Sequence, residues 1–284
     1  MTLQDEQRAI NEKVRPHIPI DGWNSTVAIV VARGNDVHQF GTGVLFRVAQ
    51  DAFVITAGHV ARKAAENKWT QGLAGVSESI VALSGQWLCT DEDPFDIAVH
   101  QLPQSTVDKL KGKVFLRFDD IDFEPQSPLA VFTIFGFPEV WSSPSTNESE
   151  KLTLKPFEFT TYRYDRDTAA LSGYEERYHL LLDAQPRDIS LDDGSAAEFR
   201  TLQGLPASFP KDVVGISGCS VWRIGDLRVP IEEWGRDRAR IVAVQTSVYS
   251  GKAAIKATRW IAVSTLIHDA FPELRPAMTL WRRR

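Results

Sequence analysis

Short runs of hydrophobic and β-branched residues, separated by turn-forming residues, dominate the chain from Thr26 onward. Runs of this length and composition are typical of β-strands. About a dozen short strands with few helices indicate a β-barrel or β-sandwich architecture, and two barrels in tandem fit the number. The expected strands cover residues 26–32, 43–48, 52–56, 79–83, 96–102, 129–135, 157–164, 178–184, 219–224, 240–248 and 260–263.

Three segments have a helical pattern instead. A thin apolar stripe predicts a short amphipathic helix over residues 2–14, and residues 60–67 predict one or two helical turns. Residues 264–271 predict a helix that begins at Ser264, a good N-cap, and stops at Pro272. The pattern divides the chain into a helical extension (1–22), a first β-barrel (23–125), a second β-barrel (126–263) and a C-terminal helix and tail (264–284).

Two loops, 140–150 and 186–211, are longer than a bare two-barrel domain needs. Loops of that length in a compact domain tend to be functional or mobile.

The composition limits the classes of partner. The 284 residues carry a net charge of −5 with a pI near 5.7, which does not favour a nucleic-acid partner. The eight tryptophans lack the interleaved basic residues of a base-stacking surface, so we interpret them as core and groove residues. No segment has the length and hydrophobicity of a membrane span or a signal peptide, and we expect a soluble cytoplasmic protein. The composition leaves the oligomeric state open.

Cys89 and Cys219 are the two cysteines of the chain, so at most one disulfide is available. No nearby histidine pair completes the ligand spacing of a metal site. We expect structural thiols, and neither a metal nor an organic cofactor.

Candidate chemistry lies at Gly215-Ile216-Ser217-Gly218-Cys219-Ser220. Glycines on both sides of Ser217 allow a sharp turn that exposes the hydroxyl and the nearby amides. A serine hydroxyl is a weak nucleophile at neutral pH, so it needs a base, and the base needs an acid that orients it.

Two further sequence motifs supply a candidate base and a candidate acid. His59 ends the run Phe53-Val54-Ile55-Thr56-Ala57-Gly58-His59, and an imidazole at a strand end suits a base at neutral pH. Asp96 precedes the short strand Ile97-Ala98-Val99. A partly buried carboxylate there would accept the imidazole N–H and fix its tautomer. Taken singly, a histidine at a strand end favours a structural role and the hexapeptide favours an ordinary Gly-Ser turn, while a turn aspartate is the alternative for Asp96.

The order His59, Asp96, Ser217, together with Thr-Ala-Gly-His, Asp-Ile-Ala-Val and Gly-Ile-Ser-Gly, resembles the trypsin-like (chymotrypsin-fold) serine peptidases, particularly the disulfide-free bacterial ones. The resemblance implies an all-β fold of two tandem antiparallel six-stranded barrels, with the active site between them. It also implies an oxyanion hole formed by the backbone N–H groups of Gly215 and Ser217.

Two residues beside the nucleophile depart from the family pattern. Cys219 stands where the family has glycine. Ile216 stands where secreted relatives have an aspartate that receives a new N-terminus after zymogen cleavage. The chain therefore lacks that activation device.

The resemblance also assigns a substrate pocket. Thr246 would place its hydroxyl on Asp96, and Ser247 and Val248 would form a wall. The pocket floor falls on Lys211, with Asp212 one position away. A lysine floor favours an acidic substrate side chain, and an aspartate floor a basic one.

The leading hypothesis is a serine endopeptidase that acts on protein or peptide substrates through a His59-Asp96-Ser217 triad and an acyl-enzyme. One alternative is a catalytically weak or inactive peptidase-like scaffold. Another is the protease module of a larger bacterial stress or defence protein.

Overall fold

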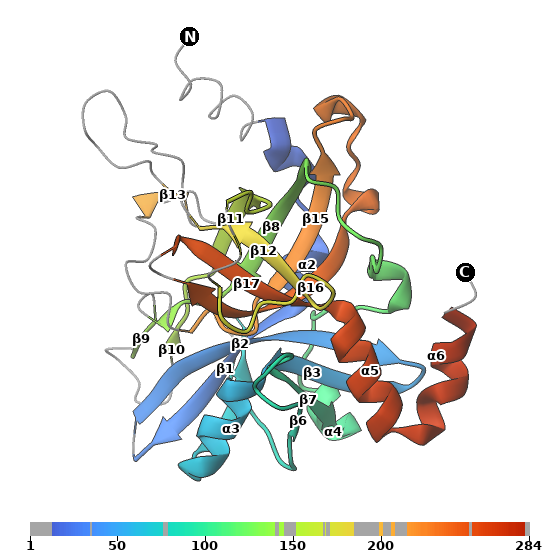
Figure 1. Ribbon diagram of the computed structural model, residues 1–284. Coiled ribbons are helices and arrows are strands. Elements are labelled where there is room, and N and C mark those ends of the chain that lie inside the picture. The colour runs from blue at the N-terminus through green and yellow to red at the C-terminus, as the bar shows by residue number, and fades with distance from the viewer. Residues whose placement is uncertain are drawn as a thin grey trace.

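In the computed structural model, the chain folds into two main antiparallel β-sheets that follow each other in the sequence (Figure 1). The described residues are 13–34, 36–75, 79–139, 142–144, 152–166, 168, 171–184, 199–200, 206–207, 215–249 and 252–281.

The first sheet has seven strands in the order β5-β4-β1-β2-β3-β7-β6. Its far edges approach each other through side chains of the segment between β5 and β6. Trp87 Nε1 donates to Gln71 Oε1 over 2.9 Å, and His100 Nε2 lies 3.1 Å from the carbonyl of Ser84. The sheet therefore curls toward closure. Its strands are β1 (Thr26–Arg33), β2 (Asp36–Val48), β3 (Asp51–Ala57), β4 (Thr70–Ala74), β5 (Val81–Ala82), β6 (Leu88–Cys89) and β7 (Ile97–Leu102).

The second sheet has six strands in the order β11-β8-β15-β16-β17-β12. It closes where Arg163 bridges Leu182 and where Tyr164 N–H donates to the carbonyl of Leu181 over 2.9 Å. Closure pairs the last two edges of this sheet. Its strands are β8 (Ala130–Gly136), β11 (Phe157–Tyr162), β12 (His179–Asp183), β15 (Ser220–Asp226), β16 (Arg240–Tyr249) and β17 (Ala254–Arg259).

Two short strand pairs lie outside these sheets. They are β9 (Ser143–Pro144) with β10 (Leu152–Thr153), and β13 (Phe199–Arg200) with β14 (Pro206–Ala207).

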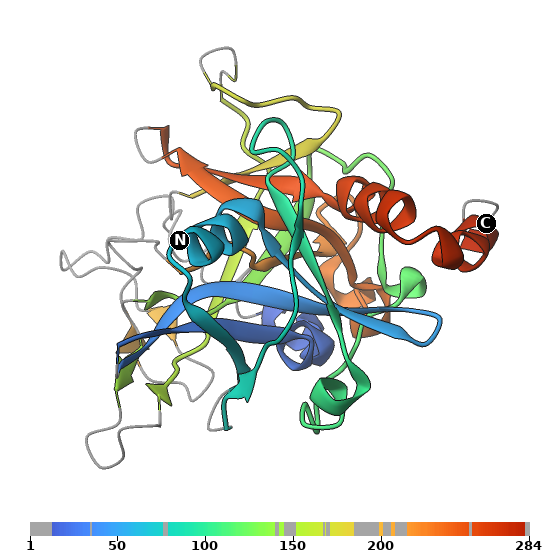
Figure 2. The ribbon, with the colours of Figure 1, turned by 90° about the horizontal axis from the view of Figure 1, so that it is seen from below.

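Helices are few and lie outside the sheets, and α5 and α6 project together on one side (Figure 2). No helix in the described ranges is long and apolar enough to cross a bilayer. The α-helices are α2 (Ile20–Asn24), α3 (Gly58–Glu66), α4 (Gln104–Val107), α5 (Trp260–Ala270) and α6 (Arg275–Trp281), and single 3₁₀ turns cover Arg15–His17, Phe118–Asp120, Ile231–Glu233, Arg236–Arg238 and Pro272–Leu274.

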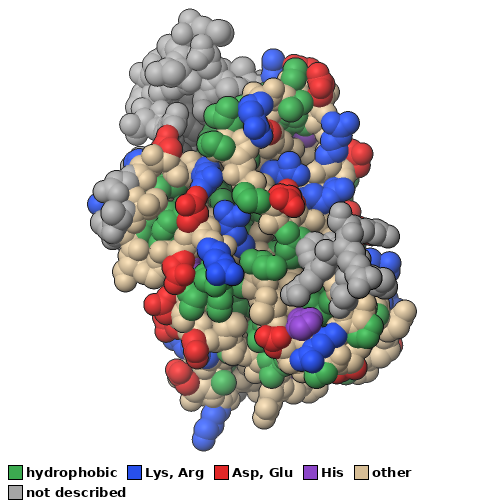
Figure 3. All heavy atoms as spheres, turned by 45° about the vertical axis from the view of Figure 1, so that its right-hand side comes forward, with side chains coloured by type: hydrophobic (Ala, Val, Ile, Leu, Met, Phe, Trp, Pro, Cys, Tyr) green, Lys and Arg blue, Asp and Glu red, His purple; other side chains and the backbone are tan. Residues whose placement is uncertain are grey.

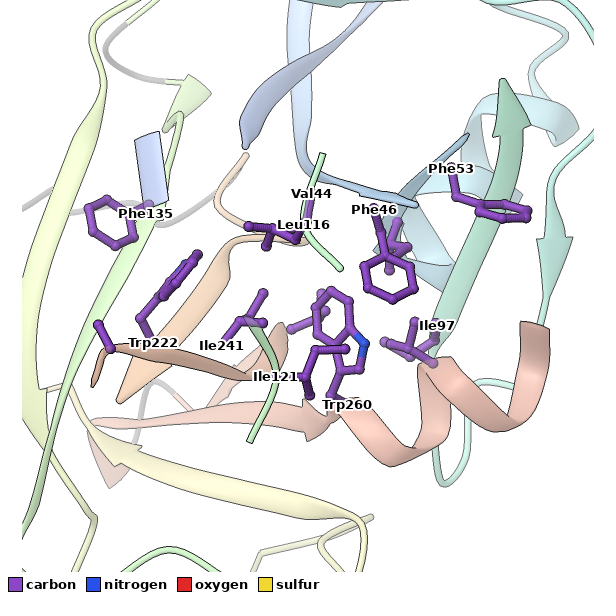
Figure 4. Close-up of a cluster of buried hydrophobic side chains, with 14 of the residues drawn as sticks. Val44, Phe46, Phe53, Ile97, Leu116, Ile121, Phe135, Trp222, Ile241 and Trp260 are labelled. Carbon is purple, nitrogen blue, oxygen red and sulfur yellow. The ribbon is translucent and has the colours of Figure 1, made fainter. Parts of the chain in front are cut away.

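A hydrophobic core lies between the two sheets and joins them (Figure 4). Phe46 of the first sheet packs edge-on against Trp260 of α5, with ring centroids 5.4 Å apart. Ile241 of the second sheet belongs to the same buried cluster. Because one apolar cluster takes side chains from both sheets, separating the sheets would expose it to water. The two sheets are therefore held in one relative position.

The all-β, two-sheet architecture confirms the expected fold class, although the first sheet has seven strands and not the expected six. The expected strand at 260–263 is wrong, because these residues form the first turn of α5. Trp260, Val263, Ser264 and Ile267 are all buried, which is helical spacing. A short apolar run by itself does not distinguish a strand from a buried helix.

Other expectations differ at element ends. The strand expected from Asp96 begins at Ile97, and the helical turns expected from Val60 begin at Gly58. The strand β17, which follows residue 253, was not expected. The helix expected over 2–14 and the loops at 140–150 and 186–211 lie largely outside the described residues.

Candidate active site

His59 and Asp96 meet where the end of β3 lies beside the start of β7 in the first sheet. His59 is the second residue of α3, directly after β3, and Asp96 directly precedes β7, which pairs with β3. Asp96 Oδ2 lies 2.7 Å from His59 Nδ1. The carboxylate only accepts, so Nδ1 carries a proton, and in the neutral imidazole the lone pair is then on Nε2. The pairing of β3 with β7 thus fixes the orientation of the imidazole.

The backbone around Asp96 holds its carboxylate in this position. Asp96 has a φ of +49°, and its carbonyl accepts the N–H of Gly58 over 2.7 Å. Its Oδ1 accepts the N–H of His59 over 2.8 Å. The side chain is 8% exposed, so these hydrogen bonds replace water around a largely buried charge.

Arg62 is a further partner of Asp96, which the sequence reasoning missed. Its Nη2 donates to Asp96 Oδ1 over 2.6 Å, and its Nη1 donates to the carbonyl of Thr90 over 2.9 Å. Arg62 follows His59 by three positions on α3, so both side chains lie on the same helix face. That spacing is the signal that would have identified it.

Ser217 occupies a tight turn. The carbonyl of Ile216 accepts the N–H of Cys219 over 2.9 Å, and Gly218 has a φ of +94°. This is the pattern of a type II turn, which requires a positive φ at its third residue. A Cβ at Gly218 would lie 1.9 Å from the carbonyl oxygen of Thr42. Glycine is therefore required here both by conformation and by space.

Two backbone amides at this turn have no acceptor among the described residues. Within the described residues, the backbone N–H groups of Gly215 and Ser217 donate to no acceptor. The carbonyl of Gly215 accepts from Gln39 Nε2 and from Thr42 Oγ1, both over 3.1 Å. The two N–H groups therefore lie on a segment whose orientation is held by the first sheet.

Thr42 of β2 is the main link between the two sheets at this turn. Its N–H donates to the carbonyl of Ser217 over 2.8 Å, and its hydroxyl accepts the N–H of Phe137 over 3.0 Å while donating to Gly215. Its own carbonyl accepts from Thr56 Oγ1 over 2.7 Å. Thr42 is fully buried, so each of these bonds positions the Ser217 turn without competition from water.

Gly41 brings the Ser217 turn next to α3. A Cβ at Gly41 would lie 2.7 Å from Val60 Cγ1 and 3.5 Å from the carbonyl oxygen of Ser217. Val60 is the neighbour of His59. The first turn of α3 and the Ser217 turn thus flank the same glycine.

Both departures from the family motif are accommodated by packing. Ile216 is fully buried in the core of the second sheet. Cys219 is buried against Gly136, where a Cβ would lie only 1.9 Å from its Sγ. Burial raises the pKa of the Cys219 thiol well above its usual range. Cys219 thus has the structural role expected of it, whereas Cys89 is an exposed free thiol.

The expected substrate-pocket residues lie along β16, where a β-bulge falls between Gln245 and Ser247. The bulge turns the Thr246 side chain inward, with its hydroxyl 3.4 Å from Thr258 Oγ1. The expected hydrogen bond from Thr246 to Asp96 is therefore replaced: Thr258 Oγ1 donates over 2.7 Å to the carbonyl of Phe95, the residue before Asp96.

Ser247 and Val248 are half-buried, and Lys211 lies outside the described residues. In the described ranges, no group of three or more His, Cys, Asp or Glu side chains is arranged to hold a metal ion.

No protein-family model and no curated protein sequence matches the chain. Solved structures are similar to it at low identity. A Glu endopeptidase structure has 12% identity and a TM-score of 0.49, covering 89% of this chain and 92% of that one. The serine protease domain of the Sesbania mosaic virus polyprotein has 14% identity and a TM-score of 0.42, covering 84% and 90%. The protease Anisep from Arthrobacter nicotinovorans has 12% identity and a TM-score of 0.41, also covering 84% and 90%. The architecture that the two sheets establish is a two-barrel, chymotrypsin-like fold.

Proposed function

We propose that this chain is a serine endopeptidase whose nucleophile is Ser217, whose base is His59 and whose orienting acid is Asp96. The observation that carries the proposal is the 2.7 Å contact between His59 Nδ1 and Asp96 Oδ2, beside a type II turn that presents Ser217. A histidine tautomer set by a buried carboxylate is what a serine needs to become a nucleophile.

The reaction follows from these groups. His59 Nε2 takes the proton of the Ser217 hydroxyl as the oxygen attacks the peptide carbonyl. The imidazolium then gives this proton to the leaving amine, and an acyl-enzyme remains on Ser217. Water, activated by His59 in the same way, releases the acid and restores the serine. Asp96 stays ionised and stabilises the imidazolium through its contact with Nδ1.

The amides of Gly215 and Ser217 would stabilise the oxyanion. They have no acceptor in the described part of the chain, so they are available to the oxygen on which negative charge develops. Donors already held in place cost no reorganisation during the reaction, and each is worth about 3 kcal/mol of the barrier. Gln39 and Thr42 supply that rigidity by holding the carbonyl of Gly215.

The substrate would be a protein or peptide chain, with Ser247 and Val248 beside the side chain that precedes the cleaved bond. We keep Lys211 as the proposed floor, which favours an acidic side chain there. A panel of fluorogenic peptides that differ only in that residue tests this choice. Equal cleavage of acidic, basic and apolar versions would exclude a charged floor.

A fluorophosphonate probe tests the nucleophile directly, because it forms a covalent bond with an activated serine. We expect one labelled site on the purified chain, lost in Ser217→Ala and in His59→Ala. Ser105→Ala, which changes an exposed serine of α4, is the matched control and should label normally.

Labelling that survives Ser217→Ala would place the nucleophile elsewhere. Absence of labelling in the unmodified chain, with no cleavage of denatured casein, would favour the inactive scaffold over the peptidase.

A further inference from the structure

A cavity of about 910 Å³ lies behind the segment that carries Asp96, on the side of α5. Its wall includes Thr90 and Phe95 of that segment, Tyr178 before β12, and Ile261 and Leu266 of α5. Ile261 is 37% exposed and belongs to the wall of this cavity. The cavity is therefore mainly apolar and is as large as typical ligand pockets.

Three arginines line the same cavity: Arg163, Arg177 and Arg259. On the face seen in Figure 3, Lys and Arg side chains lie among hydrophobic ones. Arg163 is paired with Glu176 over 2.7 Å. In the described part of the chain, neither Arg177 nor Arg259 is paired with a carboxylate. The cavity thus holds two cations that, among the described residues, make no direct contact with a carboxylate.

Arg259 is the more informative of the two, because it is half-buried. Its Nε donates to the carbonyl of His179 over 3.2 Å, which fixes the direction of the guanidinium. Burial lowers the pKa of Arg259 and the positive charge of Arg163 lowers it further, while the charges of Tyr174 and Glu176 act in the opposite direction. An anion in the cavity would relieve both effects. Arg177, which is exposed, lies over the Tyr178 ring with its Cζ 5.2 Å from the centroid.

The acidic residues of the wall make no ion pair with Arg177 or Arg259 in the described part of the chain. Glu176 pairs with Arg163 and acts on Arg259 only through space, and Asp269 lies 2.9 Å from His268 Nδ1. A ligand that neutralises Arg177 and Arg259 must therefore come from outside the cavity and bring its own negative charge.

We propose that this cavity is a second binding site, which takes a peptide segment of a partner protein that combines an acidic side chain with an aromatic or aliphatic neighbour. The carboxylate would pair with Arg259 and Arg177, and the apolar neighbour would lie against Phe95, Tyr178 and Ile261. A charge-assisted, forked arginine–carboxylate pair is the contact that gives such a site its specificity. The binding itself does not depend on the proposed peptidase activity.

The site adjoins the groups that hold Asp96. The carbonyl of Thr90 accepts from Arg62, which in turn donates to Asp96. The Phe95 ring packs edge-on against Tyr178, with centroids 4.7 Å apart, and its carbonyl accepts from Thr258. An occupant that presses on Thr90 and Phe95 is therefore two hydrogen bonds away from the His59–Asp96 pair.

Fluorescence anisotropy with the full chain carrying Ser217→Ala tests the site without cleavage. The probe is a fluorescein-labelled hexapeptide that alternates Glu with Phe. We expect saturable binding that weakens at least about tenfold when Gln replaces every Glu, since an ion pair with a half-buried arginine is lost.

Arg259→Gln and Arg177→Gln should each weaken binding of the acidic peptide about fivefold to tenfold. Arg228→Gln is the control and should bind as before, because Arg228 is paired with Asp226 and lies outside this cavity. Arg177 is exposed, so its variant folds even if the Arg259 variant does not.

Equal binding of the Glu and Gln peptides, or binding unchanged in both arginine variants, would overturn the proposal. So would the absence of peptide binding, whether or not octanoate or a single-stranded oligonucleotide binds instead. The link to Asp96 has a separate readout, the downfield proton resonance of His59 Nδ1, which we expect to shift when the acidic peptide is added. If the resonance does not shift when the peptide is saturating, the proposed link to Asp96 is refuted, and the proposed binding site is unaffected.

Discussion

Gly136 and Cys219 share one buried space, so we predict that enlarging the first residue can be compensated by reducing the second. Cys219 stands where the family motif has glycine, and its thiol fills the space next to Gly136. An added methyl group at Gly136 would lie 1.9 Å from Cys219 Sγ, 3.3 Å from its Cβ and 3.0 Å from Thr42 Oγ1. Gly136→Ala alone must therefore displace the segment that follows Ser217.

The magnitudes follow from packing. Gly136→Ala overpacks a buried contact and should cost about 2–3 kcal/mol of the free energy of unfolding. Cys219→Gly removes a buried thiol and adds backbone freedom, and should cost about 2 kcal/mol. In the double variant the new methyl group occupies the space left by the thiol, and only the close approach to Thr42 remains. We expect the double variant to lose about 2 kcal/mol, so the coupling between the two sites is about 2–3 kcal/mol.

Urea denaturation of the four proteins measures this coupling, and the rate of fluorophosphonate labelling at Ser217 reports the turn geometry. We expect labelling to slow in Gly136→Ala and to recover in the double variant. Losses of stability that add within about 0.5 kcal/mol would refute the reasoning, because they would show that the two residues do not share one space.

Three further predictions rest on single side chains. His179 Nδ1 accepts a backbone N–H, and burial lowers the pKa of His179 below 6.5. The folded state therefore disfavours the charged form, and the free energy of unfolding should fall as the pH drops below 6.5, by up to about 1.4 kcal/mol per pH unit. Urea midpoints measured from pH 7 to about pH 5 should depend less steeply on pH in His179→Gln than in the unmodified chain. An equal pH dependence of the two proteins would contradict this. Thr42→Val leaves the buried N–H of Phe137 unpaired and should lower the free energy of unfolding, measured by denaturation, by about 1–3 kcal/mol, whereas Thr42→Ser should keep most of the original stability. Equal stability of the two variants would show that the hydroxyl hydrogen bond does not stabilise the fold. Arg62→Gln removes a charged donor from Asp96 and should slow labelling about tenfold, with partial recovery in Arg62→Lys; labelling at the unmodified rate would show that Arg62 is dispensable.

The sequence by itself determined the features that depend on local backbone and side-chain pattern. Short β-branched runs predicted most strands of both sheets because strand preference is expressed within a few residues. The glycine after Ser217 was identifiable for the same reason, since a positive φ at that point is a local requirement. The His59–Asp96 contact was predicted from two motifs at strand ends, and the pairing of β3 with β7 brings them together.

Only the tertiary structure decided which side chains meet across elements. The partners of Asp96 include Arg62. Thr246, which was expected to donate to Asp96, is turned inward at a bulge in β16, and Thr258 donates instead to the carbonyl of Phe95. Whether Trp260 begins a strand or a helix was decided by the core between the sheets, which buries one helical face. These outcomes depend on the position of distant segments, and hydrophobic periodicity along the chain carries no information about that position.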